Sequence, residues 1–323
     1  MDNRAVVITG ACGFIGSNAV HQLGKEHKII AVDHFENFES IKNLFKTKIY
    51  DFMYPDELLQ KSSQWMQENV KAIIHLGANS STTTTDVKDV MTNNVMQTIQ
   101  LATKFAPATR VVYASSASVY GHHGGYGQED DYERKDRPSD IRPICLYAQS
   151  KAWIDQALVN HDNVFGLRYF NVYGPREKHK GSQASVIPSF RDQIRSRKHI
   201  VKLFDWRHRY SLTPFERDWV YVDDVVEITR RIALNDRFEQ NQNRNRIYNV
   251  GTGFAHSYEE IVDHIGDILK IKPKVKYIKM PEELKKQYQI KTRADISKLL
   301  EAIGGYQFAN IKDGINKYFE SDV

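Results

Sequence analysis

The sequence is poor in cysteine and has no long uninterrupted hydrophobic run. Cys12 and Cys145 are its only cysteines in 323 residues, and neither has a partner at the spacing of a zinc site. We therefore expect neither a disulfide framework nor a metal site. No apolar segment reaches the length of a signal peptide or of a membrane span, so a soluble, cytoplasmic protein without a membrane partner is expected.

The sequence also lacks a strong excess of either charge, with a formal net charge of +5. Its densest basic stretch contains Lys178, Lys180, Arg191, Arg195, Arg197 and Lys198. Such a stretch can bind nucleic acid, but scattered Lys and Arg residues more often form a solvated face, and diphosphates also attract them. The expected partner is an acidic small molecule and not a nucleic acid.

Short β-branched runs alternate with longer amphipathic stretches in the first half of the chain. Strands are expected at Ala5–Thr9, 28–33, 72–76, 110–114 and Val164–Tyr169, and helices at 90–105 and 150–159. This alternation is typical of β-α-β units that build a parallel sheet. The predicted fold class is α/β, a Rossmann-type doubly wound parallel sheet with a smaller C-terminal substrate-binding domain.

The pattern changes after Tyr169, where glycine and proline divide the chain into shorter elements. A strand is expected at 219–222, then a helix, and a further strand at Ile247–Val250. We predict that residues 1–173 form the dinucleotide-binding domain and that about 219–250 return to it. Residues 174–218 and 251–323 are predicted to bind the nucleotide sugar.

Three glycines lie between the first predicted strand and the first predicted helix. Because Gly10, Gly13 and Gly16 lack Cβ atoms, the amides of this turn can approach a diphosphate, and the helix N-terminus adds partial positive charge. A glycine-rich turn without a ligand is the alternative, but the strand before it and the helix after it favour a dinucleotide site. Phe14 and Ile15 belong to the same turn and are included in that site.

An acidic residue, Asp33, ends the second predicted strand. Its carboxylate can accept hydrogen bonds from adenosine ribose hydroxyls, and it repels a 2′-phosphate unless a basic residue compensates. His34, Glu36 and Glu39 follow before the first lysine, Lys42. The local charge therefore favours tightly bound NAD, with NADP as the alternative, and His34 is included in the cofactor site.

Tyr147 and Lys151 are four positions apart, which places both side chains on one face of a helix. The ammonium and a cationic nicotinamide would both favour the phenolate, so that the tyrosine could exchange a proton with an alcohol. A surface Tyr and Lys on one helix face are common, so this pair alone is weak evidence. Ser116, at the end of another predicted strand, can hydrogen-bond the reacting oxygen, and the three residues together indicate an oxidoreductase centre.

These motifs resemble those of the extended short-chain dehydrogenases that act on nucleotide sugars. The resemblance rests on the glycine turn, Asn93-Asn94, the run ASSASVYG at 114–121 and the Tyr147/Lys151 pair. Further runs resemble the ADP-L-glycero-D-manno-heptose 6-epimerase family, namely SSTT at 80–83, RYFNVYGPRE at 168–177 and HKGS at 179–182. The resemblance covers nearly the whole chain.

The resemblance implies an epimerase that oxidises its sugar transiently to a carbonyl and reduces it again from the opposite face. Tyr147 and Lys180 would be the two acid/base groups, assisted by Ser116 and Lys151. Further cofactor contacts would come from Asp51, Phe52, Leu76, Ala78 and Asn94. Substrate contacts would come from Ser80, Ser81, Ser116, Asn171, Lys180, Ser182, Phe204, Arg217 and Tyr288. Helices 90–105 and 150–159 resemble those that pair between subunits, so a homo-oligomer is expected.

Two features depart from this family. The family usually prefers NADP, yet no basic partner directly follows Asp33, and the segment 204–216, expected near the nucleotide base, is longer than its counterpart. A related 4-epimerase or a net dehydrogenase on a GDP- or UDP-linked sugar is the main alternative. A 4,6-dehydratase is less favoured because Ala117 and Ser118 occupy the positions of its acid/base carboxylates, and a non-catalytic dinucleotide sensor would need none of the catalytic residues.

Overall fold

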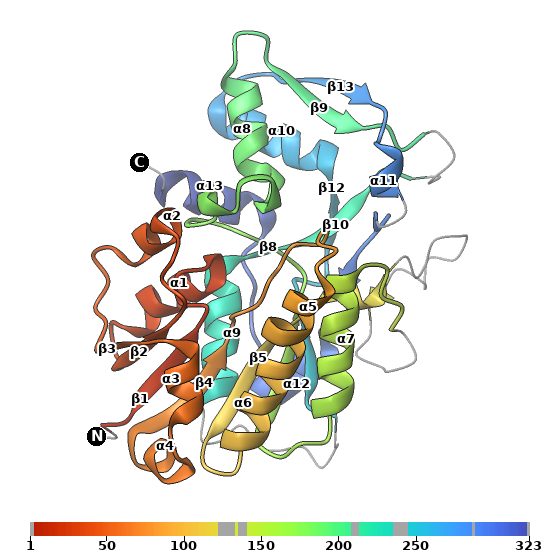
Figure 1. The fold of residues 1–323 in the computed structure, drawn as a ribbon. Helices are drawn as coiled ribbons and strands as arrows, with labels where there is room; N and C mark the ends of the chain where they lie inside the picture. The colour runs from red at the N-terminus through yellow and green to blue at the C-terminus, as the bar shows by residue number, and fades with distance from the viewer. Residues whose placement is uncertain are drawn as a thin grey trace.

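Seven parallel strands form the central sheet of this computed structural model, which describes residues 3–121, 133–134, 141–207, 213–234, 245–285 and 288–321 (Figure 1). The strand order is β11-β7-β5-β4-β1-β2-β3. The strands are β1 Ala5–Thr9, β2 Ile29–Val32, β3 Asp51–Met53, β4 Val70–His75, β5 Arg110–Ser116, β7 Val164–Tyr169 and β11 Ile247–Val250. The predicted α/β class with a Rossmann-type parallel sheet is confirmed.

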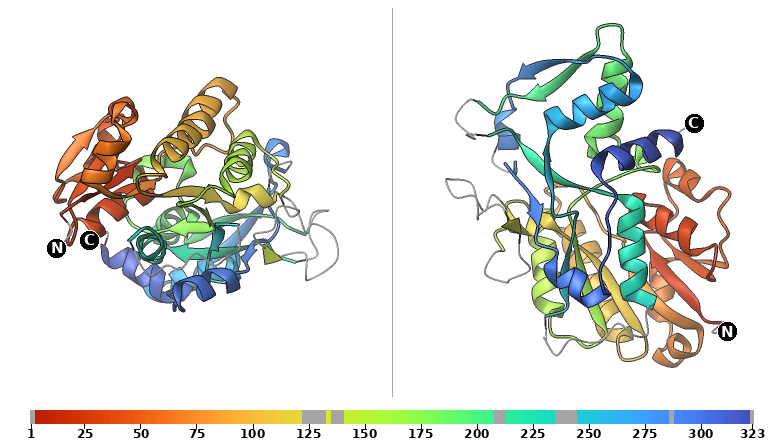
Figure 2. Two further views of the ribbon diagram at one scale, coloured as in Figure 1. Left: turned by 90° about the horizontal axis from the view of Figure 1, so that it is seen from below. Right: turned by 180° about the vertical axis from the view of Figure 1, so that it is seen from behind.

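Helices cover both faces of this sheet, which explains why β1, β2 and β7 are buried along their whole length. One face packs against α1 Phe14–Leu23, α9 Val222–Leu234 and α12 Ser297–Ile303. The other packs against α3 Pro55–Gln60, α4 Ser63–Asn69, α6 Gln97–Phe105 and α7 Leu146–Leu158. The view from behind shows α9 crossing the first of these faces (Figure 2).

A second, smaller lobe lies above the carboxyl ends of the strands and has its own apolar core (Figure 1). It contains α8 Val186–Arg195, β9 Ile200–Phe204, α10 Tyr258–Leu269, β13 Lys274–Ile278 and α13 Ile311–Ser321. A three-stranded sheet joins the lobes, in the order β12 Ala255–Ser257, β10 Glu216–Tyr221 and β8 Asn171–Tyr173. Short elements complete the chain: α2 Phe38–Ile41, η1 Lys42–Leu44, α5 Val87–Asp89, η2 Val90–Met96, η3 Ala117–Tyr120, β6 Glu133–Arg134, η6 Lys178–Gln183, α11 Glu282–Lys285 and β14 Arg293–Ala294.

Several elements differ from the sequence expectations. The helix expected at 90–105 consists of the wider π-type turns of η2 followed by α6. The strand expected at 219–222 is β10, which begins at Glu216 and pairs with β8 and β12 outside the central sheet. Its inner residues are buried on both faces because it runs between the two lobes. The three-residue strand β3 was not expected, because it is too short to show an alternating pattern.

The helices of the described ranges are all too short or too polar to cross a lipid bilayer.

Candidate active site

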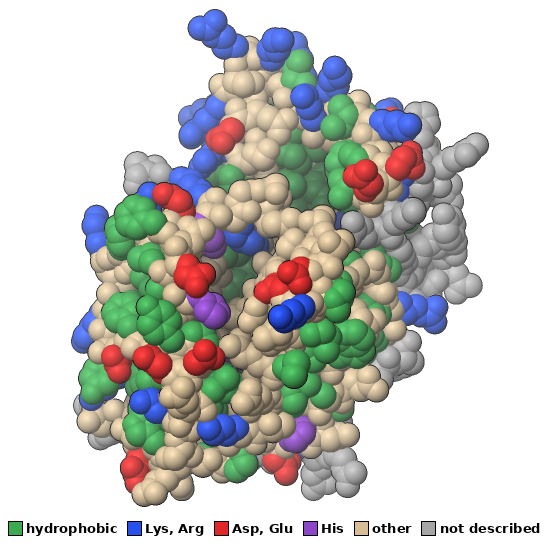
Figure 3. Space-filling model, in the orientation of Figure 1, with side chains coloured by type: hydrophobic (Ala, Val, Ile, Leu, Met, Phe, Trp, Pro, Cys, Tyr) green, Lys and Arg blue, Asp and Glu red, His purple; other side chains and the backbone are tan. Residues whose placement is uncertain are grey.

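A cavity of about 740 Å³ opens at the carboxyl ends of the central strands, where the two lobes meet. The space-filling view shows this face of the molecule hollowed between them (Figure 3). Residues that follow four strands line it: Gly10 after β1, Asp33 after β2, Leu76 after β4 and Ser116 at the end of β5. This edge is where open parallel sheets bind their ligands.

The glycine turn has the geometry that a diphosphate requires. Gly10 has a φ of +64°, and a Cβ on it would lie 2.7 Å from the backbone N of Gly77; a Cβ on Gly16 would lie 1.9 Å from the carbonyl oxygen of Gly10. Helix α1 begins at Gly13 without a side-chain cap, so its first amides are available to an anion. All five residues expected from this turn, Gly10, Gly13, Phe14, Ile15 and Gly16, line the cavity.

Asp33 is held at the cavity wall by two backbone amides. Its carboxylate oxygens accept hydrogen bonds from Cys12 N and from His34 N, both at 2.8 Å. Burial and the charge of Asp33 raise the pKa of the Cys12 thiol to about 12, so the thiol stays protonated. Lys42, which could have compensated a 2′-phosphate, forms an ion pair with Glu39 at 2.6 Å. The charge around Asp33 therefore suits a ribose with free hydroxyls.

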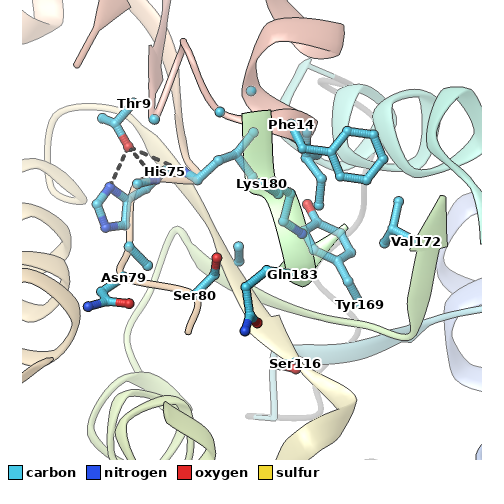
Figure 4. Close-up of a pocket in the computed structure, with 18 of the residues that line it drawn as sticks. Thr9, Phe14, His75, Asn79, Ser80, Ser116, Tyr169, Val172, Lys180 and Gln183 are labelled. Atoms are coloured by element: carbon cyan, nitrogen blue, oxygen red, sulfur yellow. Dashed lines mark hydrogen bonds between the residues drawn. The ribbon is translucent and has the colours of Figure 1, made fainter. Parts of the chain in front are cut away.

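A buried histidine network shapes the wall after β4. Thr9 Oγ1 accepts hydrogen bonds from the amides of Leu76 and Gly77, both at 3.2 Å, and therefore donates to His75 Nδ1 at 2.7 Å (Figure 4). The opposite ring nitrogen of His75 donates to Thr98 Oγ1 at 2.8 Å. Burial lowers the pKa of His75 to about 3, so the ring is neutral. Sequence reasoning missed Thr9 and His75, although both end strands at the carboxyl edge.

Tyr147, Lys151 and Ser116 meet in the cavity. The Lys151 ammonium donates to the carbonyl oxygen of Ala114 at 2.8 Å and lies 5.8 Å from the centre of the Tyr147 ring. Burial raises the pKa of Tyr147 to about 12, although a hydrogen bond with Ser116 lowers it, and burial lowers the pKa of Lys151 to about 8. The expected lowering of the tyrosine's pKa by Lys151 is not seen here: burial dominates, and the group that lowers this pKa is Ser116. The positive charge of a nicotinamide would have to act as well.

Three of the expected cofactor residues lie outside the cavity lining, whereas Leu76 and Ala78 are part of it. Asn94 is fully buried. Its side-chain oxygen accepts a hydrogen bond from Asn79 N at 2.8 Å, and its side-chain nitrogen donates to Asn79 O at 2.9 Å and to Ser150 Oγ at 3.2 Å. It therefore braces the wall after β4 against α7. Asp51 and Phe52 have exposed side chains on β3, where the Phe52 ring contacts Phe35.

Lys180 reaches the cavity from η6, and Figure 4 shows it extending from its loop toward the other labelled residues. Its ammonium lies 5.5 Å from the centre of the Phe14 ring. Burial lowers its pKa, and the carboxylate of Glu177 opposes that shift. Ser182, expected from the sequence to contact substrate, is exposed and outside the lining, whereas its neighbour Gln183 lines the cavity. The loop has no sequence periodicity that could have shown whether the side chain of Ser182 or that of Gln183 faces the cavity.

Ser80 and Asn171 line the cavity, but Ser81 does not: its amide donates to Asn79 Oδ1 at 3.0 Å. Phe204, Arg217 and Tyr288 form a separate cluster in which the guanidinium lies 4.9 Å from the Tyr288 ring centre and 5.7 Å from that of Tyr258. Tyr258 lines the cavity and so connects the two groups. Within the described ranges no carboxylate forms an ion pair with Arg217. Residues 208–212 of the long segment 204–216 lie outside the described residues.

The comparisons with known proteins agree with this geometry. Residues 6–251 match the model of the NAD dependent epimerase/dehydratase family. A relative from Brachyspira hyodysenteriae, named ADP-L-glycero-D-manno-heptose-6-epimerase, is 37% identical over 98% of this chain and 96% of its own. A relative of the same name from Cupriavidus pinatubonensis is 33% identical over 97% of each chain. The crystal structure of the Helicobacter pylori protein of that name superimposes with a TM-score of 0.78, at 28% identity over 99% of this chain and 96% of that one.

The chain belongs to the NAD dependent epimerase/dehydratase family, and its cofactor is accordingly a nicotinamide dinucleotide. The resemblance of its motifs to the ADP-L-glycero-D-manno-heptose 6-epimerase family is confirmed by the two relatives, each of which aligns along nearly the whole chain.

Proposed function

We propose that this protein is an ADP-glycero-manno-heptose 6-epimerase that inverts the configuration at C6 of its sugar. The observation that carries this proposal is that Tyr147 and Lys180 line one cavity from separate elements, α7 and η6. Inversion through a carbonyl needs proton transfer in two poses of the sugar, and two separate acid/base groups satisfy that need. The relatives that bear this enzyme's name support the choice of substrate.

Each group would have a distinct part in the reaction. Tyr147 exchanges the hydroxyl proton in one pose of the sugar, with the Ser116 hydroxyl directed at the same oxygen, and Lys151 adds positive charge beside the phenol. Lys180 exchanges the proton in the other pose, and its lowered pKa makes the neutral amine more accessible. The glycine turn and Asp33 would hold the dinucleotide, whose nicotinamide would supply reversible hydride exchange with the sugar carbon and so no net redox change. Ala117 and Ser118, which follow Ser116, offer no carboxylate for a dehydration.

The remaining residues would hold the two ligands. Residues 1–173, together with about 219–250, would bind the dinucleotide, with Asp33 on the adenosine ribose. Residues 174–218 and 251–323, which form the smaller lobe except for α12 on the central sheet, would bind the nucleotide sugar. Asn171 and Ser80 would contact the sugar from the cavity wall, while Arg217, between Tyr258 and Tyr288, would bind the diphosphate through charge-assisted hydrogen bonds.

A homo-oligomer is part of this proposal. Met96 and Trp153 belong to the two helical regions expected to pair between subunits, and they are 61% and 40% exposed. Large apolar side chains on a surface favour burial against a partner. Size-exclusion chromatography with light scattering would test this part independently of activity.

Direct assay of the two epimers would test the reaction. The purified protein would be incubated separately with ADP-D-glycero- and ADP-L-glycero-D-manno-heptose, and the products separated chromatographically and identified by NMR. Both reactions should reach the same epimer ratio without added oxidant or reductant. GDP- and UDP-linked sugars, tested in parallel, should not react. Turnover of a UDP sugar alone, or stoichiometric accumulation of NADH, would instead support a 4-epimerase or a dehydrogenase.

A further inference from the structure

The loop that carries Lys180 is closed by a buried carboxylate. Glu177 is completely buried, and its two carboxylate oxygens accept hydrogen bonds from Ser185 N at 2.6 Å and from Ser185 Oγ at 2.7 Å. Its backbone carbonyl oxygen accepts a hydrogen bond from Lys180 N at 3.0 Å. Glu177 thus joins the two ends of the loop 177–185 and holds Lys180 between them.

Within the loop, backbone bonds join Lys180 N to Glu177 O at 3.0 Å and Ala184 N to Gly181 O at 3.2 Å. The loop contains a kink at Gly181, where φ is +54° and a Cβ would meet no atom within 4 Å, so the loop is loosely packed there. Ser185, in contrast, is the N-cap of α8, whose residues Ile187, Phe190 and Ile194 are buried in the core of the smaller lobe. The bonds from Glu177 to Ser185 therefore attach a loose loop to a firmly packed helix.

The carboxylate of Glu177 also acts on the charge of Lys180. Burial lowers the pKa of the lysine and Glu177 raises it. The other group of this loop that interacts with the Lys180 charge is His179, and the Phe14 ring of α1 faces the ammonium. Tyr147 and Lys151 of α7 line the same cavity. Asp33 also lines this cavity and acts on His179, whereas Glu177 is the carboxylate that acts on Lys180.

We propose that Glu177 is a positioning residue for Lys180: through Ser185 it closes the loop 177–185 and fixes the direction of the lysine into the cavity. Its negative charge acts on the same amine. This inference rests on the proposed function, which makes Lys180 the second acid/base group. Glu177 itself contacts neither substrate nor cofactor, because its carboxylate is directed at Ser185 and fully enclosed.

Three variants separate geometry from charge. In Glu177→Gln the amide can still accept from Ser185 N and can donate to Ser185 Oγ, so the loop stays closed while the charge is lost. Ser185→Ala keeps the charge and removes one of the two bonds. Glu177→Ala removes both, and a 1 Å misplacement of a catalytic group can cost about 10²-fold in rate. Should Glu177→Ala fail to fold, the other two variants still carry the test.

The readouts are kcat, KM and the pH profile of kcat, together with retained dinucleotide as a check of folding. We expect Glu177→Gln to shift the limb that depends on Lys180 to lower pH, because the ammonium loses its stabilising neighbour. Ser185→Ala should reduce kcat without that shift, and KM should change little in either variant. The limb of the pH profile that depends on Lys180 is identified by comparison with Lys180→Met, whose residual activity should lack that limb.

Glu260→Gln is the control, because Glu260 also accepts a hydrogen bond from the backbone N of an N-cap serine, Ser257 of α10, at 2.7 Å. Its side chain is 56% exposed and lies outside the cavity lining. It should leave the pH profile unchanged. A wild-type kcat and pH profile in Glu177→Gln and Ser185→Ala, with Lys180→Met inactive, would overturn this inference alone. Wild-type turnover in Lys180→Met would overturn the assignment of Lys180 in the proposed function.

Discussion

The backbone N–H of Cys12 donates a hydrogen bond to the carboxylate of Asp33 at 2.8 Å. This bond links the glycine turn after β1 to the residue that directly follows β2. This bond fixes the carboxylate at the place where the adenosine ribose of a dinucleotide lies in such folds. Lys42, the first lysine after Asp33, is paired with Glu39 at 2.6 Å and so is not directed at this carboxylate. An added 2′-phosphate would therefore meet an uncompensated negative charge.

The first prediction concerns which dinucleotide the protein binds. The protein should release NAD, and not NADP, when it is denatured, and Asp33→Ser should reduce the preference for NAD in reconstitution assays. Mass spectrometry of the released dinucleotide measures the first, and titration of the apoprotein with each dinucleotide measures the second. Gln60→Ala, which changes an exposed side chain outside the cavity lining without changing charge, is the control. NADP as the dominant species would show that the charge argument is wrong.

The second prediction concerns the two acid/base residues. Tyr147→Phe and Lys180→Met should each reduce turnover by about 10²- to 10⁴-fold, the contribution typical of positioned acid/base groups, and both should still bind the dinucleotide. Steady-state epimerisation and circular dichroism provide the measurements. Full activity of the Tyr147 variant would remove that residue from the centre of the mechanism.

The third prediction concerns Gln183, the residue next to Ser182 in the loop that carries Lys180. The Gln183 amide lines the cavity, so Gln183→Ala should raise KM for the nucleotide sugar by about three- to tenfold, the loss of one ordinary hydrogen bond, and leave dinucleotide binding unchanged. The sequence-based assignment of Ser182 makes the opposite forecast. If Ser182→Ala raised KM and Gln183→Ala did not, the loop would present the other side chain to the substrate.

The fourth prediction is a pH dependence of stability. Burial lowers the pKa of Lys151 from 10.5 to about 8, so between these values the unfolded chain binds a proton that the folded protein lacks. The free energy of unfolding therefore rises with pH in this window, by on the order of 3 kcal/mol for this group. Lys151→Met lacks the effect, and urea unfolding of both proteins at several pH values would measure it. A wild-type-minus-variant difference that stays constant with pH would contradict the lowered pKa.

The fifth prediction tests a buried ion pair behind the catalytic helix. Arg168 Nε contacts Asp155 Oδ2 at 2.8 Å, and each side chain is 1% exposed. Removing one partner leaves a buried charge unpaired, so Asp155→Asn should lower the free energy of unfolding by about 3–5 kcal/mol. Glu227→Gln, in partly exposed pairs with Arg230 and Arg231, should change it by about 1 kcal/mol or less for each pair. If urea unfolding gave equal losses for Asp155→Asn and Glu227→Gln, the greater contribution of the buried pair would be refuted.

Local patterns in the sequence account for much of the fold and for the parts of the cavity lining that lie within one turn or one helix. Strands β1, β7 and β11 lie at the predicted residues, because short β-branched runs carry their own signal. The glycine turn and the Tyr147/Lys151 pair were also predictable, since each depends on spacing within one turn or one helix. β10 illustrates the limit: its residues were recognised as a strand, but its partners β8 and β12 come from distant parts of the chain.

The sequence by itself thus determined strands of the central sheet, the glycine turn after β1 and the placement of Tyr147 and Lys151 on one helix, because short-range periodicity and spacing specify them. Only the tertiary structure decided that Gln183 and not Ser182 lines the cavity, that Asn94 braces the wall behind it, and that Glu177 closes the loop of Lys180. Side-chain direction in an irregular loop depends on backbone angles such as that of Gly181 and on bonds to residues far along the chain or in another element. No periodic pattern records such contacts, so they appear only when the chain is folded.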